Sequence, residues 1–106
     1  MKRYKVERTD KADELLHRIV LMIAKNYGVD VALKKLDEIE AQIMLLATEP
    51  EMGVVPKYDI LRRQGYRVLI MKKDLVFYKV DHQKRLVTVY AVVDARQDYL
   101  DILAGL

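Results

Sequence analysis

The chain has 106 residues, no cysteine and a formal net charge of +3. This length fits one small domain over residues 1–106 with a core of its own, and the lack of cysteine excludes disulfides and thiolate metal sites. No apolar run reaches the roughly 18 residues that a membrane helix needs, and the start lacks the apolar core of a signal peptide. We therefore expect a cytoplasmic protein with no membrane association.

Charge is distributed unevenly along the chain. Residues 1–56 contain nine Lys and Arg against ten Asp and Glu, whereas residues 57–106 contain ten against six. A basic C-terminal half indicates an anionic partner, but a solubilising surface accounts for the same imbalance equally well.

A strand and a helix are expected at the start of the chain. Charged and apolar residues alternate over Lys2–Arg8, which is typical of a short strand and predicts pairing with later strands. Either Thr9 or Asp10 is suited to cap the helix that follows. Apolar residues then recur at helical spacing to about Asn26, and Gly28 is expected to end this helix.

A second helix should follow at once. Asp30 is its candidate N-cap, and a further apolar stripe continues to about Thr48. The link of Gly28 and Val29 is so short that the two helices are expected to form an antiparallel hairpin. Prolines and a glycine interrupt Glu49–Gln64, which we expect to be a loop.

Three runs of alternating apolar residues come next, separated by short polar turns. They cover Tyr66–Met71, Leu75–Asp81 and Leu86–Asp94, and they predict a three-stranded antiparallel meander. Strict alternation places Val89 and Ala91 on one face of the last strand. Both faces are apolar, so a helical hairpin on one face would leave the other partly uncovered. The apolar residues of an expected short C-terminal helix are Tyr99, Ile102, Leu103 and Leu106.

These elements define an α+β fold: an N-terminal strand, a two-helix hairpin, an antiparallel meander and a short C-terminal helix. Three motifs accompany this order, GlyTyrArg at 65–67, LeuValPheTyrLysValAsp at 75–81 and ArgGlnAspTyr at 96–99. Over nearly its whole length the chain resembles the RelE/ParE family of toxins from bacterial type II toxin–antitoxin modules. The stretch LysLeuAspGluIleGluAlaGlnIle at 35–43 and the following Glu49 and Pro50 are similar to its plasmid-stabilisation branch.

The resemblance implies a toxin that causes growth arrest and that a cognate antitoxin holds inactive in a hetero-oligomeric complex. RelE-like members enter the ribosome and cut messenger RNA without a metal, whereas ParE-like members inhibit DNA gyrase. We expect ParE-like inhibition of gyrase, with a RelE-like, ribosome-dependent endoribonuclease as the alternative. No cofactor or metal is expected for either activity.

A ribonuclease that uses a ribose 2′-hydroxyl needs a base, a cation beside the phosphate and an acid for the leaving oxygen. By resemblance, Arg67, Arg96 and Tyr99 match residues of the RelE-like site and would be catalytic if the chain is a ribonuclease. Further basic residues could contact a nucleic acid or another target. These are Arg62, Arg63, Lys72 and Lys73.

The chain also departs from the RelE-like pattern. Leu69 and Leu75 stand where RelE-like members carry a lysine and an arginine, and Asp94 stands near a histidine of some ribonuclease branches. A carboxylate at that position could act as a base, but it would repel phosphate unless it were paired with an arginine. His17 and His82 are expected to be surface residues rather than catalysts. These departures favour the ParE-like interpretation.

Plainer roles also fit the candidate residues. Arg96 could form an ordinary surface ion pair with Asp98, a contact worth about 0–1 kcal/mol. Tyr99 begins the apolar stripe of the tail, so packing against the core or a partner is as well supported as chemistry.

Overall fold

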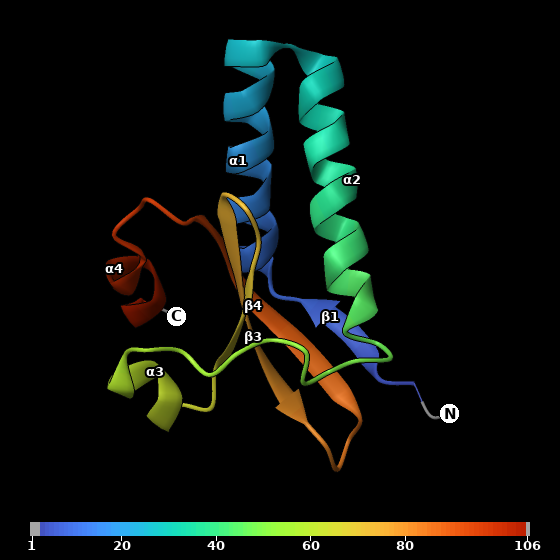
Figure 1. Ribbon diagram of the computed structural model, residues 1–106, viewed down its shortest axis with the longest axis vertical. Helices are drawn as coiled ribbons and strands as arrows, with labels where there is room; N and C mark the ends of the chain where they lie inside the picture. The colour runs from blue at the N-terminus through green and yellow to red at the C-terminus, as the bar shows by residue number, and fades with distance from the viewer. Residues whose placement is uncertain (1–2, 106) are drawn as a thin grey trace.

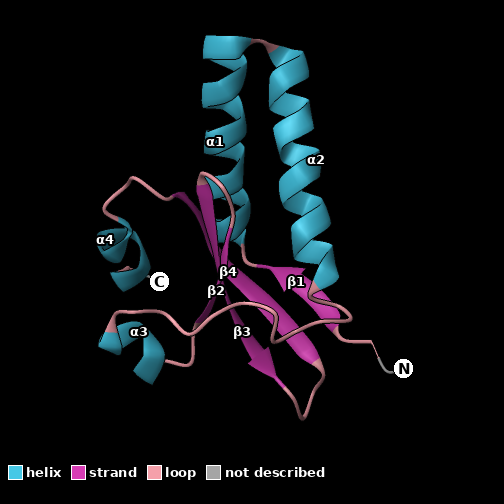
Figure 2. Ribbon diagram, viewed as in Figure 1, coloured by secondary structure: helices cyan, strands magenta, loops and turns pink. Residues whose placement is uncertain are grey.

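The computed structural model describes residues 3–105. A hairpin of two long helices stands above a sheet, and its upper turns extend past the sheet, while two short helices lie to the left in the same view (Figure 1). The helices are α1 (Asp10–Tyr27), α2 (Val29–Leu45), α3 (Asp59–Arg63) and α4 (Tyr99–Ala104). The strands are β1 (Lys5–Arg8), β2 (Arg67–Ile70), β3 (Asp74–Asp81) and β4 (Leu86–Asp94) (Figure 2). Among these residues, no helix combines the length and the apolar character that crossing a membrane requires.

The helical hairpin begins and turns at residues with clear local roles. The Thr9 side chain accepts a hydrogen bond from the Ala12 backbone N–H at 3.0 Å, so Thr9 is the N-cap of α1. Gly28 ends α1 with a φ of 98°, a conformation that favours glycine. The prediction that Asp30 caps the second helix is wrong, because α2 starts at Val29 directly after Gly28 and leaves Asp30 inside its first turn.

The segment Glu49–Gln64, predicted to be a loop, contains the helix α3. With five residues, α3 is too short to show a helical period in the sequence. It forms because Leu61 packs into the core, where it is only 3% exposed. Earlier in the segment, Val54 pairs with Val68 of β2 through two backbone hydrogen bonds of 2.9 Å.

The sheet has the strand order β1-β4-β3-β2. The pairs β2–β3 and β3–β4 are antiparallel, as the meander predicts, whereas β1 runs parallel to β4. The predicted N-terminal strand therefore pairs with the meander, at its β4 edge. Lys2 of that predicted strand and Leu106 of the predicted tail lie outside the described residues.

A bulge in β4 changes which side chains share a face. Phe77 pairs with Ala91, but the next residue, Tyr78, pairs with Val89, so Tyr90 is the extra residue. Ala91 therefore lies on the face opposite Val89, and the prediction from strict alternation is wrong at this point.

Two clusters of buried side chains lie on opposite faces of the sheet. One is between the sheet and the α1–α2 hairpin and includes Leu16, Ile39, Val76, Tyr78 and Val89. The other is beneath α3 and α4 and includes Leu61, Val68, Phe77, Ala91 and Leu103. The second apolar face is thus covered largely by the chain's own short helices, and part of it stays open as a groove.

Candidate functional site

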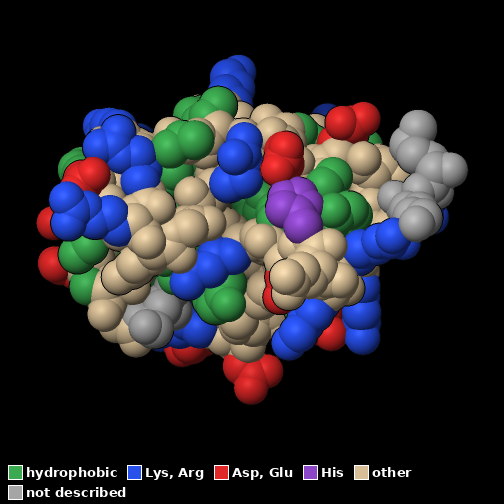
Figure 3. Space-filling model, turned by 90° about the horizontal axis from the view of Figure 1, so that it is seen from below, with side chains coloured by type: hydrophobic (Ala, Val, Ile, Leu, Met, Phe, Trp, Pro, Cys, Tyr) green, Lys and Arg blue, Asp and Glu red, His purple; other side chains and the backbone are tan. Residues whose placement is uncertain are grey.

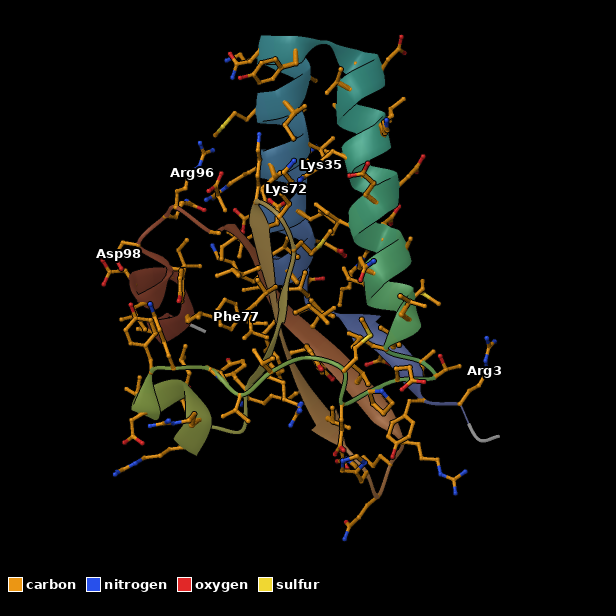
Figure 4. The ribbon with its side chains drawn as sticks, in the orientation of Figure 1. Arg3, Lys35, Lys72, Phe77, Arg96 and Asp98 are labelled. Atoms are coloured by element: carbon orange, nitrogen blue, oxygen red, sulfur yellow. The ribbon has the colours of Figure 1, made fainter. Side chains whose placement is uncertain are left out.

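Three of the predicted cations lie at one edge of the sheet. Lys72 and Lys73 are exposed in the β2–β3 turn, and Arg96 follows β4. The backbone N–H of Ala95 donates a hydrogen bond to the Lys73 carbonyl at 2.9 Å, which holds the two segments side by side. In Figure 4, Lys72 lies at the upper end of the β2–β3 hairpin and Arg96 projects from the loop that leads to α4. We call Lys72, Lys73 and Arg96 the basic edge.

Arg96 is held by Asp94 and not by Asp98. Asp94 Oδ1 accepts hydrogen bonds from the Arg96 backbone N–H at 2.8 Å and from Nε at 3.0 Å, and Oδ2 accepts one from Nη2 at 2.8 Å. The side-chain hydrogen bond from Arg96 lowers the pKa of Asp94 to about 2. A general base for neutral pH works best with a pKa near the working pH, so this pairing disfavours Asp94 as a base.

A second carboxylate lies next to Asp94. Asp74 is the cross-strand partner of Asp94 and is 2% exposed. The ammonium of Lys35, on α2, contacts Asp74 Oδ2. Lys35 and Asp74 are far apart in the sequence, and although the stretch 35–43 begins at Lys35, nothing in it indicates a contact with Asp74. At this edge, Lys35 and Arg96 are each paired with a carboxylate, which leaves Lys72 and Lys73 to meet an anionic group.

Arg67 lies away from the basic edge. It pairs with Tyr78, on the face of the sheet that carries the helical hairpin. At about 3.4 Å per residue, Tyr78 is about 14 Å along β3 from Asp74. The Arg67 guanidinium also has partners already, since Nη2 donates to the carbonyls of Glu51 at 3.0 Å and Gly53 at 2.7 Å. Arg67 therefore fastens the loop after α2 to the sheet.

Tyr99 lies on the opposite face from Arg67. Its ring centroid is 5.2 Å from that of Phe77 and 5.9 Å from that of Tyr58. Burial raises the pKa of the Tyr99 hydroxyl. These contacts fit the packing role, since Tyr99 attaches α4 to β3 and to the start of α3.

Arg62 and Arg63 are on α3, and both pair with Asp59, at 3.1 Å and 2.8 Å. Basic side chains are also spread widely over the face of the molecule seen from below, where acidic and hydrophobic groups lie between them (Figure 3). The predicted cations are thus divided among three places: the basic edge, α3 and, for Arg67, the sheet face beneath the helical hairpin.

The two leucines that depart from the RelE-like pattern are core residues. Leu69 is 5% exposed beneath the helical hairpin, and Leu75 is 9% exposed on the other face. Within residues 3–105, no three His, Asp or Glu side chains are grouped so as to hold a metal ion.

Two solved structures define the class of fold. The chromosomal ParDE toxin–antitoxin system from P. aeruginosa matches with a TM-score of 0.71 and 18% identity, over 86% of this chain and 95% of that chain. The toxin–antitoxin complex RelBE2 from Mycobacterium tuberculosis matches with a TM-score of 0.66 and 18% identity, over 92% of this chain and 97% of that chain. At such low identity these likenesses show the RelE/ParE-like fold alone.

The sequence itself shows the family. Residues 6–99 match the family model of the ParE toxin of the type II toxin–antitoxin system parDE. The chain belongs to this family of toxins. No curated protein sequence matches it.

Proposed function

We propose that this protein is the toxin of a type II toxin–antitoxin module and that it arrests growth by binding DNA gyrase, in the ParE-like manner. The choice of gyrase over messenger RNA rests on the pairing of Arg96 with Asp94. The Arg96 guanidinium is held by Asp94 through Nε and Nη2, so a phosphate that binds the remaining N–H groups lies beside a carboxylate that repels it. The match to the ParE toxin family supports the same choice.

The neighbouring positions support a binding role over RNA cleavage. Leu69 and Leu75 are core residues, and Tyr99 packs between Phe77 and Tyr58. RNA cleavage needs groups that accept and donate protons beside the phosphate. Asp94 remains ionised at neutral pH, because the hydrogen bond from Arg96 lowers its pKa to about 2, and the same pairing raises the pKa of Arg96, so neither side chain is suited to exchange a proton there.

One observation favours the second candidate, a ribosome-dependent endoribonuclease. Lys72, Lys73 and Arg96 lie on adjacent segments of one edge, and several cations together are suited to hold an RNA backbone. In that case Arg96 would stabilise the phosphate in the transition state, a contribution typically worth a factor of about 10²–10³ in rate.

The two targets are separated by expressing the chain under tight control and measuring growth, DNA supercoiling and messenger RNA integrity in parallel. We expect growth arrest with loss of supercoiling and intact messenger RNA, and the purified protein should inhibit gyrase in a supercoiling assay. Cleavage of messenger RNA on the ribosome, abolished by Arg96→Ala, would instead establish the endoribonuclease.

Arg18→Ala is the matched control for Arg96→Ala. Arg18 is also an exposed arginine in a local ion pair, with Glu14 at 2.7 Å, but it lies on α1. Its replacement should leave arrest unchanged. Absence of growth arrest in wild-type cells that contain the folded chain and lack an antitoxin would contradict the toxin function itself.

We place the antitoxin in the groove that remains open on the second face of the sheet. This groove has a volume of about 450 Å³ and lies between residues 54–58 and residues 95–99. Exposed apolar side chains border it, including Ile70, which is 68% exposed, and Val55, which is 58% exposed. Lys57 lines it, and Lys72 and Lys73 follow Ile70 in the chain. An acidic segment with apolar side chains fits this combination.

The edge of β2 gives such a segment backbone partners. Val68 uses its N–H and C=O to pair with Val54. Because backbone groups alternate along a strand, Ile70 presents its N–H and C=O to the same edge. A partner strand could therefore extend the sheet beside Ile70, the mode known as β-augmentation.

Ile70→Asp should weaken antitoxin binding at least tenfold, because it places a negative charge in the path of an acidic apolar segment. The measurement is calorimetric titration with the cognate antitoxin. Met22→Asp is the matched control, since Met22 is 64% exposed but lies on α1. An equal loss of affinity in both variants would contradict this docking site.

A further inference from the structure

Three side chains from separate segments form a hydrogen-bonded chain. Tyr4 precedes β1, Glu51 follows α2, and His82 lies at the β3–β4 turn. The Tyr4 hydroxyl is 2.6 Å from His82 Nδ1, and His82 Nε2 is 2.8 Å from Glu51 Oε1. We call these residues the tyrosine triad. The expectation that His82 is a surface residue holds, as its side chain is 54% exposed, but the ring is hydrogen-bonded on both sides.

The carboxylate determines which nitrogen carries the proton. An ionised Glu51 has only acceptors, so Nε2 of His82 must be the donor of that hydrogen bond. In the neutral imidazole, Nδ1 is then unprotonated and accepts the hydrogen bond from the Tyr4 hydroxyl. The direction of both bonds is therefore set: tyrosine to histidine, and histidine to glutamate.

This arrangement has the parts of an activated nucleophile. A hydroxyl, a base within hydrogen-bond reach and a third group that orients the base are the general signature of nucleophilic sites. Backbone contacts hold the parts in place, since Tyr4 N–H donates to the Ala47 carbonyl at 2.8 Å and Arg67 donates to the Glu51 carbonyl. The rings of Tyr4 and His82 meet edge to face, at 89° and 5.6 Å.

We propose that Tyr4 is a site of covalent modification that accepts an acyl group from an activated ester. The Tyr4 oxygen bonds to the carbonyl carbon as its proton passes to His82 Nδ1, and the bond from that carbon to the leaving oxygen breaks with departure of the alkoxide or phenolate. Tyr4 is the reacting group, His82 the general base and Glu51 the positioning residue. The acylated tyrosine has no O–H, so it loses its hydrogen bond to His82 and with it the link from the N-terminal segment to the loop at Glu51.

The test is the rate at which p-nitrophenyl acetate acetylates each tyrosine, followed by peptide mass spectrometry. Tyr27 is the internal control, because it is 74% exposed and lies at the far end of α1. Although Tyr4 is only partly exposed, it should react at least tenfold faster than Tyr27. His82→Gln should lower the Tyr4 rate by a factor of about 10² or more, the usual range for general-base assistance. Tyr4→Phe should remove this modification and leave that of Tyr27 unchanged.

Dependence on pH separates the chemical role from a structural one. Tyr4 and Glu51 are the titratable groups that contact the His82 ring within residues 3–105. The pH profile of the Tyr4 rate should differ from that of the Tyr27 rate, and His82→Gln should make the two profiles alike. Glu51→Gln should lower the Tyr4 rate while the melting temperature and the Tyr27 rate stay constant. Equal rates at Tyr4 and Tyr27, or a Tyr4 rate unaffected by His82→Gln in a folded variant, would overturn the proposal.

Discussion

Replacing Lys35 with methionine should lower the free energy of unfolding by about 3–5 kcal/mol at neutral pH, as expected when one partner of a buried ion pair is removed. The Asp74 side chain is 3% exposed, and that of Lys35, its partner on α2, is 18% exposed. Without the ammonium, Asp74 is a buried carboxylate next to a second one, Asp94. Urea unfolding at pH 7, followed by circular dichroism, measures the change.

Lys34→Met is the matched control for Lys35→Met. Lys34 is the neighbouring lysine on α2 and is exposed, so its replacement should change stability by no more than about 0.5 kcal/mol. Combining Lys35→Met with Asp74→Asn should cost less than Lys35→Met alone, because no charge is then left buried. A double variant less stable than either single variant would show that the pair is not the source of the effect.

The Lys35–Asp74 pair also bears on function. Asp74 is the first residue of β3 and follows Lys72 and Lys73 directly. Its carbonyl accepts a hydrogen bond from the Met71 N–H at 2.9 Å, which closes the turn that carries both lysines. The contact with Lys35 therefore joins the helical hairpin to the basic edge.

Gly53→Ala should destabilise the fold by about 1–3 kcal/mol, the usual range for overpacking. A Cβ at this position would lie 2.6 Å from the Tyr78 hydroxyl oxygen and 2.8 Å from the Val68 carbonyl oxygen. The Tyr78 ring is fully buried, and its hydroxyl accepts a hydrogen bond from the Gly53 N–H at 2.9 Å, so it has little room to move. Thermal unfolding of the variant measures the loss.

Gly105→Ala is the control for this substitution. At Gly105, the nearest atom to an added Cβ is 3.6 Å away, an ordinary contact. Tyr78→Phe tests the hydrogen bond separately and should cost about 1–3 kcal/mol, because it leaves the buried Gly53 N–H unpaired. If Gly53→Ala were as stable as Gly105→Ala, the close approach of the loop to Tyr78 would not explain why position 53 is a glycine.

Long periodic segments made most of the fold predictable. The 18 residues of α1 and the 17 of α2 carry an apolar stripe over several turns, and the strands of the meander alternate over most of their length. The five-residue α3 and the bulge at Tyr90 were not predictable, since α3 is too short for its helical period to repeat and the bulge interrupts the alternation of β4. Both depend on contacts with residues distant in the chain, such as the burial of Leu61.

The candidate site was predictable only as a list of residues. The sequence by itself determined the α+β class, the order of the elements and the residue types at Arg67, Arg96 and Tyr99, because these depend on local period and on motifs. Only the tertiary structure decided that Arg67 and Tyr99 lie on opposite faces of the sheet, that Asp94 holds Arg96, and that Lys35 reaches Asp74. It likewise brought together Tyr4, Glu51 and His82. Such pairings depend on strand register and on how the loops cross the sheet, and no local pattern encodes either.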